Sequence, residues 1–394
     1  MKLMKFRNLK IEKDILKLIE KKGFDEPTII QARAIPRILE GKDVIAGSAT
    51  GSGKTLAFVV GLLHNHRDST GEVQGLVLAP TRELAQQVSR ELSYFCGSRG
   101  YNVACVYGGV AIEPQFRSLE KADFVVATPG RLLDHLGRGS VDLSKVNTLI
   151  LDEADRMLDM GFIDDVERII RKTPAKRQTI LTSATMRGEV MRLSQRYMHN
   201  PVKVFGKKEV DPSKLKQVYY DIPRNRKLSL LTYLLKKEKS DLTMVFCNSR
   251  RAVDFVTRNL QNHGINTHAI HGGFSQKQRD SAMNKFKSEN VRVLVCTDVA
   301  ARGLDIENIS HVYNYDIPRE SKQYMHRIGR TARAGEEGKA INILSGEQHE
   351  DFRRVIRDNG VRVDKVKTPE LKTSRFPGGS QRIDRHRGRE RRLK

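Results

Sequence analysis

The chain has 394 residues, of which 38% are hydrophobic and 30% are charged. This composition is typical of a globular protein and excludes a disordered or membrane-embedded chain, and the length predicts two domains rather than one core. The formal net charge of +24 predicts a polyanionic partner, with nucleic acid favoured over an anionic membrane surface.

Membrane spans, export signals and metal-binding cysteines are not expected. The apolar run at residues 57–63 is too short to cross a bilayer, and residues 1–13 are basic but lack the apolar core of a signal peptide. The cysteines show neither a paired nor a metal-binding spacing; they are Cys96, Cys105, Cys247 and Cys296. We therefore expect reduced core thiols in a cytoplasmic protein.

Residues 1–206 alternate short runs of Val, Ile and Leu with longer amphipathic stretches. The stretch at 81–95, for example, carries apolar residues at helical spacing. The expected strands lie within residues 43–48, 75–80, 102–109, 123–129, 148–155 and 178–185. Alternating strands and helices predict a parallel sheet covered by helices on both faces.

The same alternation returns in residues 217–367, after a polar stretch at 207–216 that we interpret as an interdomain linker. The expected strands of this second domain lie within residues 217–223, 242–249, 266–273, 291–298, 311–318 and 339–345. From residue 368 to 394 the apolar rhythm stops, and residues 374–394 hold eight Lys or Arg against two acidic residues. We predict two tandem α/β domains followed by a disordered basic tail.

A glycine-rich phosphate-binding loop is predicted after the first strand, because ligands bind beyond the carboxyl ends of parallel strands. The sequence "SATGSGKT" stands between that strand and a helix-like stretch, where glycines can turn backbone N–H groups toward a phosphate. Lys54 would reach the β- and γ-phosphates, and the Thr55 hydroxyl would bind Mg²⁺. The alternative is a simple glycine-rich turn. The residues concerned are Ser48, Ala49, Thr50, Gly51, Ser52, Gly53, Lys54 and Thr55.

Three carboxylates follow the strand in "LILDEADRML". Asp152, Glu153 and Asp155 repel one another and are costly to desolvate unless a cation neutralises them. Beside a phosphate site, Asp152 could hold Mg²⁺, and Glu153 could orient or deprotonate the attacking water. For Asp155 we expect an ion pair with a cation elsewhere in the fold.

These two motifs belong to a longer ordered set. "PTRELAQQ", "YGGV", "TPGRL" and "SAT" follow the phosphate loop, and "TDVAARGLD" and "HRIGRTAR" lie in the second half. Over about residues 6–345 the set resembles the DEAD-box ATP-dependent RNA helicases of helicase superfamily 2. The resemblance implies two RecA-like domains that use ATP and Mg²⁺, hydrolyse ATP on binding RNA, separate short duplexes and remodel RNA–protein complexes.

The resemblance also assigns the remaining nucleotide contacts. "GFDEPTIIQ" is similar to an adenine-recognition motif, in which the Gln31 amide pairs with adenine, Phe24 covers the ring and Phe6 lies upstream. Without the resemblance, Phe24 and Gln31 would be interpreted as an ordinary core residue and an ordinary surface residue. The other assignments are ribose contact by Asp305, arginine fingers at Arg330 and Arg333, and coupling by Ser183, Thr185 and His326. A basic helix face or an RNA-contacting patch is the alternative for the arginines.

The loops that would bind RNA share short hydroxyls, glycines and arginines, which hold phosphates and sugars and do not read base edges. The candidates are Pro80, Thr81, Arg82, Gly108, Gly109, Thr128, Arg131, Gly272, Gly273, Gln276, Arg279, Thr297, Asp298 and Arg302. The resemblance implies single-stranded RNA or one strand of a short duplex, with 2′-hydroxyl contacts. Trp is absent from the chain, and the stacking aromatics of RNA-recognition modules are missing, so we expect little sequence specificity.

Some positions depart from the common family pattern: Ser48 and Ala49 begin the phosphate loop, Ile29 replaces a frequent proline, and Ala332 replaces a usual glycine. None of these changes removes a catalytic group. Two alternatives to a helicase stay open, an ATP-gated RNA clamp or annealing protein and a DNA-directed motor. We expect a monomer with ribonucleoprotein partners.

Overall fold

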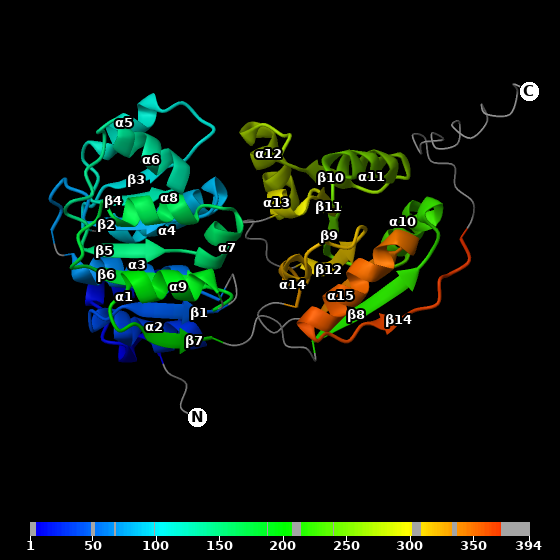
Figure 1. The fold of residues 1–394 in the computed structure, drawn as a ribbon, viewed down its shortest axis with the longest axis horizontal. Helices are drawn as coiled ribbons and strands as arrows, with labels where there is room; N and C mark the ends of the chain where they lie inside the picture. The colour runs from blue at the N-terminus through cyan, green and yellow to red at the C-terminus, as the bar shows by residue number, and fades with distance from the viewer. Residues whose placement is uncertain are drawn as a thin grey trace, which may run out of the picture. The chain divides into compact units, whose positions relative to one another are not determined.

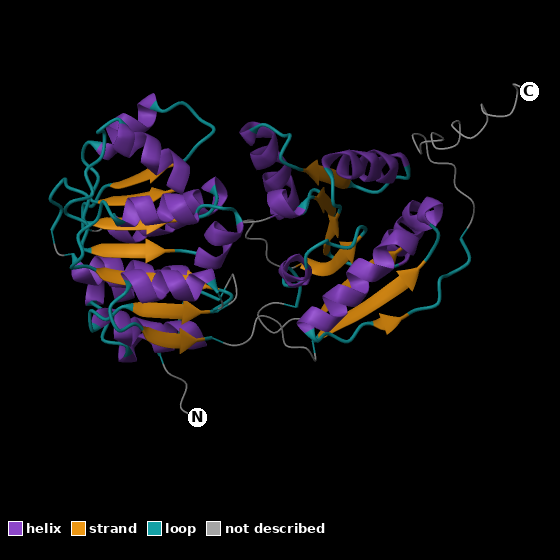
Figure 2. Cartoon of the chain, viewed as in Figure 1, coloured by secondary structure: helices purple, strands orange, loops and turns teal. Residues whose placement is uncertain are grey.

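The structure is a computed structural model that describes residues 5–48, 52–66, 68–97, 99–186, 188–206, 214–238, 240–301, 309–332 and 337–371. The chain divides into two compact units, one within residues 5–206 and the other within residues 214–371 (Figure 1). Each unit is an α/β layer structure with its own parallel sheet (Figure 2). The predicted fold class is confirmed.

The N-terminal unit is built on a seven-stranded sheet in the order β3-β4-β2-β5-β6-β1-β7. All of its strand pairs are parallel. The central strands are fully buried because both faces are covered, whereas the edge strands β3 and β7 are partly exposed. The strands are β1 (Val44–Gly47), β2 (Gly75–Leu78), β3 (Val103–Val106), β4 (Phe124–Ala127), β5 (Thr148–Leu151), β6 (Gln178–Ser183) and β7 (Val202–Phe205).

Helices cover the two faces of this sheet as separate groups. Strand residues alternate between the faces: Val44 and Ala46 belong to one hydrophobic cluster, and Ile45 to the other. The first cluster packs under the 3₁₀ helix η1 (Phe6–Asn8), α1 (Lys13–Lys21), α2 (Ile29–Leu39), α3 (Lys54–Asn65) and α4 (Arg82–Cys96). The second packs under α5 (Glu113–Leu119), α6 (Pro129–Gly137), α7 (Ala154–Asp159), α8 (Ile163–Ile170) and α9 (Glu189–Tyr197).

The C-terminal unit repeats this plan with a parallel sheet in the order β10-β11-β9-β12-β13-β8-β14. Its strands are β8 (Leu215–Asp221), β9 (Leu242–Phe246), β10 (Thr267–Ile270), β11 (Val293–Cys296), β12 (Ile309–Asn314), β13 (Gly338–Leu344) and β14 (Asp364–Lys365). Its helices are η2 (Arg224–Arg226), α10 (Lys227–Lys237), α11 (Arg250–Asn262), α12 (Gln276–Lys287), α13 (Asp298–Ala301), α14 (Ser321–Ile328), η3 (Gly346–Gln348) and α15 (His349–Asn359). α10 and α11 bury one hydrophobic cluster, and α14 and α15 bury another.

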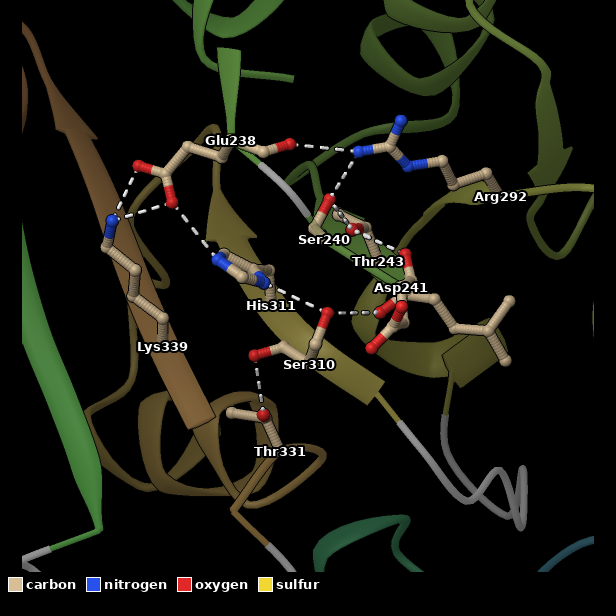
Figure 3. A network of polar contacts seen from close by, with 10 residues as sticks. Glu238, Ser240, Asp241, Thr243, Arg292, Ser310, His311, Thr331 and Lys339 are labelled. Atoms are coloured by element: carbon tan, nitrogen blue, oxygen red, sulfur yellow. Dashed lines mark hydrogen bonds and ion pairs between the residues drawn. The ribbon is translucent and has the colours of Figure 1, made fainter. Parts of the chain in front are cut away.

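A network of hydrogen bonds and ion pairs links side chains at the amino-terminal edge of this second sheet (Figure 3). Glu238, at the end of α10, lies 3.1 Å from His311 Nε2 and 2.5 Å from Lys339 Nζ. His311 Nδ1 in turn lies 2.9 Å from the Ser310 hydroxyl, and the Ser310 carbonyl accepts from the Thr331 hydroxyl at 3.0 Å. The contact with His311, followed by that with Lys339, lowers the pKa of Glu238 to about 2 against the opposing effect of burial.

The elements differ from the sequence expectations in several places, including an unexpected exposed strand, β14, and the starts of β12 at Ile309 and β13 at Gly338. β7 was not predicted, because its residues form a short, partly exposed edge strand without clear alternation. β8 begins at Leu215, so the last two residues of the expected linker belong to a strand. Ordered packing continues into the expected tail, where the Thr368 hydroxyl donates to the Asp221 carbonyl and Leu371 packs against the core. Residues 207–213 and 372–394 lie outside the described residues.

The cysteines are core thiols, as predicted. All are free, and only Cys105 is partly exposed. Burial raises the pKa of the Cys96 thiol to about 12 and that of Cys105 to about 11, so neither is reactive near neutral pH. In the described part of the chain, none of the helices is both long enough and apolar enough to cross a bilayer.

Candidate functional site

The phosphate loop and the carboxylate motif lie at one edge of the N-terminal sheet. β5, β6 and β1 are neighbours in the sheet, and all run parallel. Their carboxyl ends therefore bring "DEAD", "SAT" and the phosphate loop side by side. Ala49, Thr50 and Gly51 of that loop lie outside the described residues.

The described part of the phosphate loop has the geometry that its residue types predict. Gly53 has φ 88°, a conformation that favours glycine, and a Cβ there would lie 2.4 Å from Gln31 Nε2. Lys54 is buried at the start of α3 and donates from Nζ to the Ser48 carbonyl. Thr55 follows in the first turn of α3, and Ser52 stands just before Gly53. The positive helix end and Lys54 therefore face the same loop.

The expected adenine motif is tied directly to the phosphate loop. Thr28 and Gln31 form a capping box at the start of α2, in which Gln31 Oε1 accepts from the Thr28 backbone N–H at 2.8 Å. Gln31 Nε2 donates to the Gly53 carbonyl at 3.0 Å, and the Thr28 hydroxyl donates to the Ser52 carbonyl at 2.8 Å. Each end of the Gln31 amide still has capacity for a second hydrogen bond, which a purine could use.

The two aromatic residues assigned to this motif differ in their exposure to solvent. Phe24 is 45% exposed and could cover a ring. Phe6 is 2% exposed and packs in the hydrophobic core beneath α1 and α2, because η1 folds back against that cluster. Phe6 is a core residue in this structure, and its assignment to the nucleotide stays a prediction.

Asp152 has the environment of a ligand for a divalent cation. Its side chain is buried at the end of β5, and its Oδ1 accepts from the Thr182 hydroxyl at 2.6 Å. Burial, and secondarily the charge of Glu153, raises the pKa of Asp152 to about 6, while Thr182 and Lys54 oppose the rise. Mg²⁺ would favour the ionised form, and the hard oxygens of Asp152 and Thr55 are the ligand types that it prefers.

Glu153 is held in an uncommon conformation. Its φ of 49° and ψ of 52° are left-handed, and its backbone N–H donates to the same Thr182 hydroxyl at 3.0 Å. Its Oε2 lies 2.6 Å from Arg156 Nη1, and both side chains are about nine-tenths buried. Arg156 was missed in the sequence, although its place three residues after Glu153 at the start of a helix could have indicated the pair.

Asp155 joins the carboxylate motif to "SAT". Its Oδ2 accepts from the Ala184 and Thr185 backbone N–H groups at 3.1 and 2.9 Å and from the Thr185 hydroxyl at 3.1 Å. The Ser183 hydroxyl donates to the Thr185 carbonyl at 2.6 Å and tightens the same turn. The expected ion pair of Asp155 is therefore wrong, because backbone and hydroxyl donors satisfy this carboxylate.

The other half of the same sheet edge carries the first group of RNA candidates. β3, β4 and β2 are neighbours, and Gly108 and Gly109 follow β3, Thr128 and Arg131 follow β4, and Pro80, Thr81 and Arg82 follow β2. Arg82 Nη1 donates to the Gly108 carbonyl at 3.3 Å, and a Cβ at Gly109 would lie 2.3 Å from that nitrogen. Arg131 Nη2 donates to the Val110 carbonyl at 2.9 Å. The structure therefore brings these residues together as one row.

The second group lies at the carboxyl ends of β10 and β11. Gly272 and Gly273 follow β10, Arg279 lies on α12, and Thr297 leads into α13. Sequence reasoning missed Arg250 at the end of neighbouring β9, which is exposed and whose Nη2 would lie 3.3 Å from a Cβ at Gly272. The sequence "NSRR", which follows this strand closely, could have indicated a basic side chain at the same edge of the sheet. Arg302 and the side chain of Gln276 lie outside the described residues.

Asp298 has an internal partner. Its two carboxylate oxygens accept from Arg327 Nε and Nη2 at 2.6 and 2.7 Å, in a fork geometry. Arg327 is 1% exposed and also donates to Asn248 Oδ1 at 2.8 Å and to Asn314 Oδ1 at 3.1 Å. The Asp298 carboxylate is therefore paired with a buried cation of its own unit, and the assignment of Asp298 as an RNA contact stays a prediction.

Arg330 and His326 lie close to this ion pair. They line a small hollow together with Phe246, Asp298, Ala301, Gln323 and Arg327. Arg330 is buried, and Ala332 beyond it has φ 55°, the left-handed conformation that explains the usual glycine at this position. Asp305 and Arg333 lie outside the described residues.

Comparison with known proteins agrees with this geometry. The family model for the DEAD/DEAH box helicase matches residues 28–193, and that for the helicase conserved C-terminal domain matches residues 226–335. The chain is 44% identical to the ATP-dependent RNA helicase CshA of Listeria monocytogenes over 93% of this chain and 71% of that protein. It is 42% identical to CshA of Bacillus subtilis, over 93% and 74%.

Solved structures give the same result for the fold. A DEAD box protein from Methanococcus jannaschii is 39% identical and superposes with a TM-score of 0.57, covering 92% of this chain and 99% of that one. Dbp5 of S. cerevisiae bound to RNA and ADP BeF3 is 28% identical, with a TM-score of 0.81 over 92% of this chain and 96% of that one.

Proposed function

Because the chain belongs to the DEAD-box ATP-dependent RNA helicases, we propose that it hydrolyses ATP when RNA binds, separates short duplexes locally and remodels RNA–protein complexes. One observation carries this proposal. At the carboxyl edge of the N-terminal sheet, the residues assigned to the phosphates follow β5, β6 and β1, and those assigned to RNA follow β3, β4 and β2. The two halves meet at β2 and β5, which are neighbours.

We propose the following catalytic roles, which the positions of the side chains support. Lys54, beside the phosphate loop, would neutralise the β- and γ-phosphates, and Thr55 and Asp152 would hold Mg²⁺. When bound, Mg²⁺ offsets the charge that develops on the transferred phosphoryl group. Glu153 orients the attacking water and takes its proton. Arg330 supplies a further positive charge to the γ-phosphate, the role that the family resemblance gives it.

Coupling between RNA and hydrolysis is proposed to run through Asp155. This side chain joins α7 to the turn after β6 through the two Thr185 contacts and the Ala184 contact. Glu153 and Asp155 flank the same residue, so a shift of the turn changes where Glu153 points. Ser183 tightens the turn and His326 lies in the hollow beside Arg330, which supports their assignment to coupling.

RNA is proposed to bind through phosphates and sugars without sequence preference. Arginine side chains and the backbone N–H groups of glycines at strand ends support this mode, because contacts to RNA phosphates and sugars carry no sequence information. The net charge of +24 favours such a polyanion. We further propose a cytoplasmic monomer that acts on ribonucleoprotein partners.

The test compares ATP hydrolysis and duplex separation on matched substrates. ATP turnover is measured with no nucleic acid, with single-stranded RNA and with DNA of the same sequence. A short RNA duplex in excess over the protein then shows whether unwinding is catalytic. Multiple-turnover RNA unwinding supports the helicase. Long-lived, ATP-dependent RNA retention without turnover would establish the clamp instead, and equal stimulation by DNA would contradict the RNA assignment.

A further inference from the structure

His271 links β10 to the Gly272–Gly273 turn and uses both ring nitrogens. The side chain is 6% exposed, its Nδ1 accepts from the Gly273 backbone N–H at 3.1 Å, and its Nε2 lies 3.0 Å from Asp254 Oδ1. A backbone N–H can only donate, and an ionised carboxylate can only accept. The two contacts therefore require a neutral imidazole with its proton on Nε2.

The turn that His271 holds is tightly determined. The Phe274 backbone N–H donates to the His271 carbonyl at 3.1 Å, and the Phe274 ring meets the imidazole edge-on with centroids 4.3 Å apart. A Cβ at Gly273 would lie 3.1 Å from the imidazole, so a side chain there would push against the ring. The backbone of the turn is thus set by the ring of His271.

One backbone donor of the turn stays open. The N–H groups of Gly273 and Phe274 are both used within the turn, whereas that of Gly272 has no hydrogen-bond partner in the part of the chain that the structure describes. Gly272 is exposed and lies close to the guanidinium of Arg250. An open backbone N–H beside a cation is a combination that suits an anionic oxygen.

We propose that His271 is a positioning residue for RNA binding, which holds the turn so that the Gly272 N–H donates to an RNA phosphate. Asp254, reaching from α11, orients the imidazole as the carboxylates of other histidine pairs do. The inference rests on the proposed function, because it takes Gly272 to be an RNA contact. It adds that the Gly273 N–H belongs to His271 and that the turn offers the phosphate a single backbone donor.

Two amide substitutions separate the two hydrogen bonds of His271. His271→Asn places an oxygen near the position of Nδ1 and keeps an acceptor for the Gly273 N–H. His271→Gln is longer by one methylene, reaches toward Asp254 and leaves that N–H without an acceptor. The measurements are the RNA dissociation constant, the RNA concentration that half-saturates ATP turnover, and kcat at saturating RNA.

The expected result is a split between the two variants. His271→Gln should weaken RNA binding about tenfold, the loss that corresponds to one hydrogen bond at a preorganised site. His271→Asn should stay within about twofold of the unchanged protein, and kcat and ATP affinity should hold in both variants. Equal losses in the two variants, or no loss in either, would overturn the positioning role of the acceptor.

Three further variants keep the outcome decisive. If His271→Gln fails to fold, Asp254→Ala frees the ring while leaving the Gly273 acceptor in place, and it should weaken RNA binding about threefold with unchanged kcat; an unchanged affinity overturns the proposal. Arg82→Ala and Arg279→Ala test the RNA assignment itself. If they weaken RNA binding and the His271 variants do not, only this inference fails. If none of these variants weakens RNA binding, the proposed assignment of the strand ends to RNA is wrong as well.

Discussion

The buried pair of Glu153 and Arg156 predicts a measurable coupling energy beside the catalytic carboxylates. Arg156→Met keeps the apolar stem and removes the cation, which leaves the Glu153 carboxylate without this partner in a site that is about nine-tenths buried. Breaking a buried pair from one side costs about 3–5 kcal/mol. Arg156 Nε and Nη2 are themselves buried without a hydrogen-bond partner among the described residues, so part of the desolvation of the cation is uncompensated. We therefore expect Arg156→Met to lower the free energy of unfolding by the lower end of this range, about 3 kcal/mol.

The double variant tests this reasoning. Glu153→Gln combined with Arg156→Met removes both charges, so it should be about 2 kcal/mol more stable than the sum of the single effects predicts. Hydrogen exchange of the backbone amides in β5 and β6 measures the opening free energy of the N-terminal unit separately from the other unit. Single effects that add within about 0.5 kcal/mol would refute the energetic coupling of the pair.

Three further predictions follow from other contacts. Asp155→Ala removes the acceptor of three hydrogen bonds from the turn after β6, so the stimulation of ATP hydrolysis by saturating RNA should fall about tenfold or more, while hydrolysis measured without RNA changes by less than about threefold. Glu238→Gln should reduce the free energy of unfolding by about 1–2 kcal/mol at pH 7, because the ionised Glu238 carboxylate stabilises the fold. This stabilisation is complete above pH 4.5 and is lost as the carboxylate becomes protonated. Denaturant unfolding should therefore show the difference between the two proteins shrinking below pH 4.5 and vanishing near pH 2. Removal of the basic residues after Ser374 should weaken RNA binding at low salt and flatten the log–log salt slope by about 3 to 4, with maximal ATP turnover unchanged; identical slopes would show that RNA ignores the tail.

The fold was predictable because local pattern and topology agree in this chain. Alternating apolar runs and amphipathic stretches require parallel strands with covering helices, and both sheets have this form. The same rule placed the motifs at the carboxyl ends of strands, where Lys54 lies close enough to Asp152 for its charge to oppose the rise in that pKa. β7 escaped prediction because an exposed edge strand carries only part of the apolar signal.

The partners of individual side chains could not be predicted in the same way. The sequence shows that Asp155 needs a neutralising group, but whether this is a cation or a set of N–H donors depends on a turn that begins almost 30 residues later. Asp298 pairs with Arg327, which lies 29 positions away, and Phe6 is buried only because η1 folds onto the core. Such contacts depend on the tertiary arrangement, and local spacing does not encode it.

ATP turnover by Glu153→Gln, with and without saturating RNA and with Mg²⁺ present, tests the central claim most directly. The substitution removes the base and keeps the shape of the side chain, so ATP should bind with near-normal affinity. RNA-stimulated turnover should fall by about a hundredfold or more, the usual contribution of a general base. Near-normal hydrolysis by this variant, at unchanged ATP affinity, would contradict the assignment of Glu153 and with it the phosphate–magnesium site at the ends of β1 and β5.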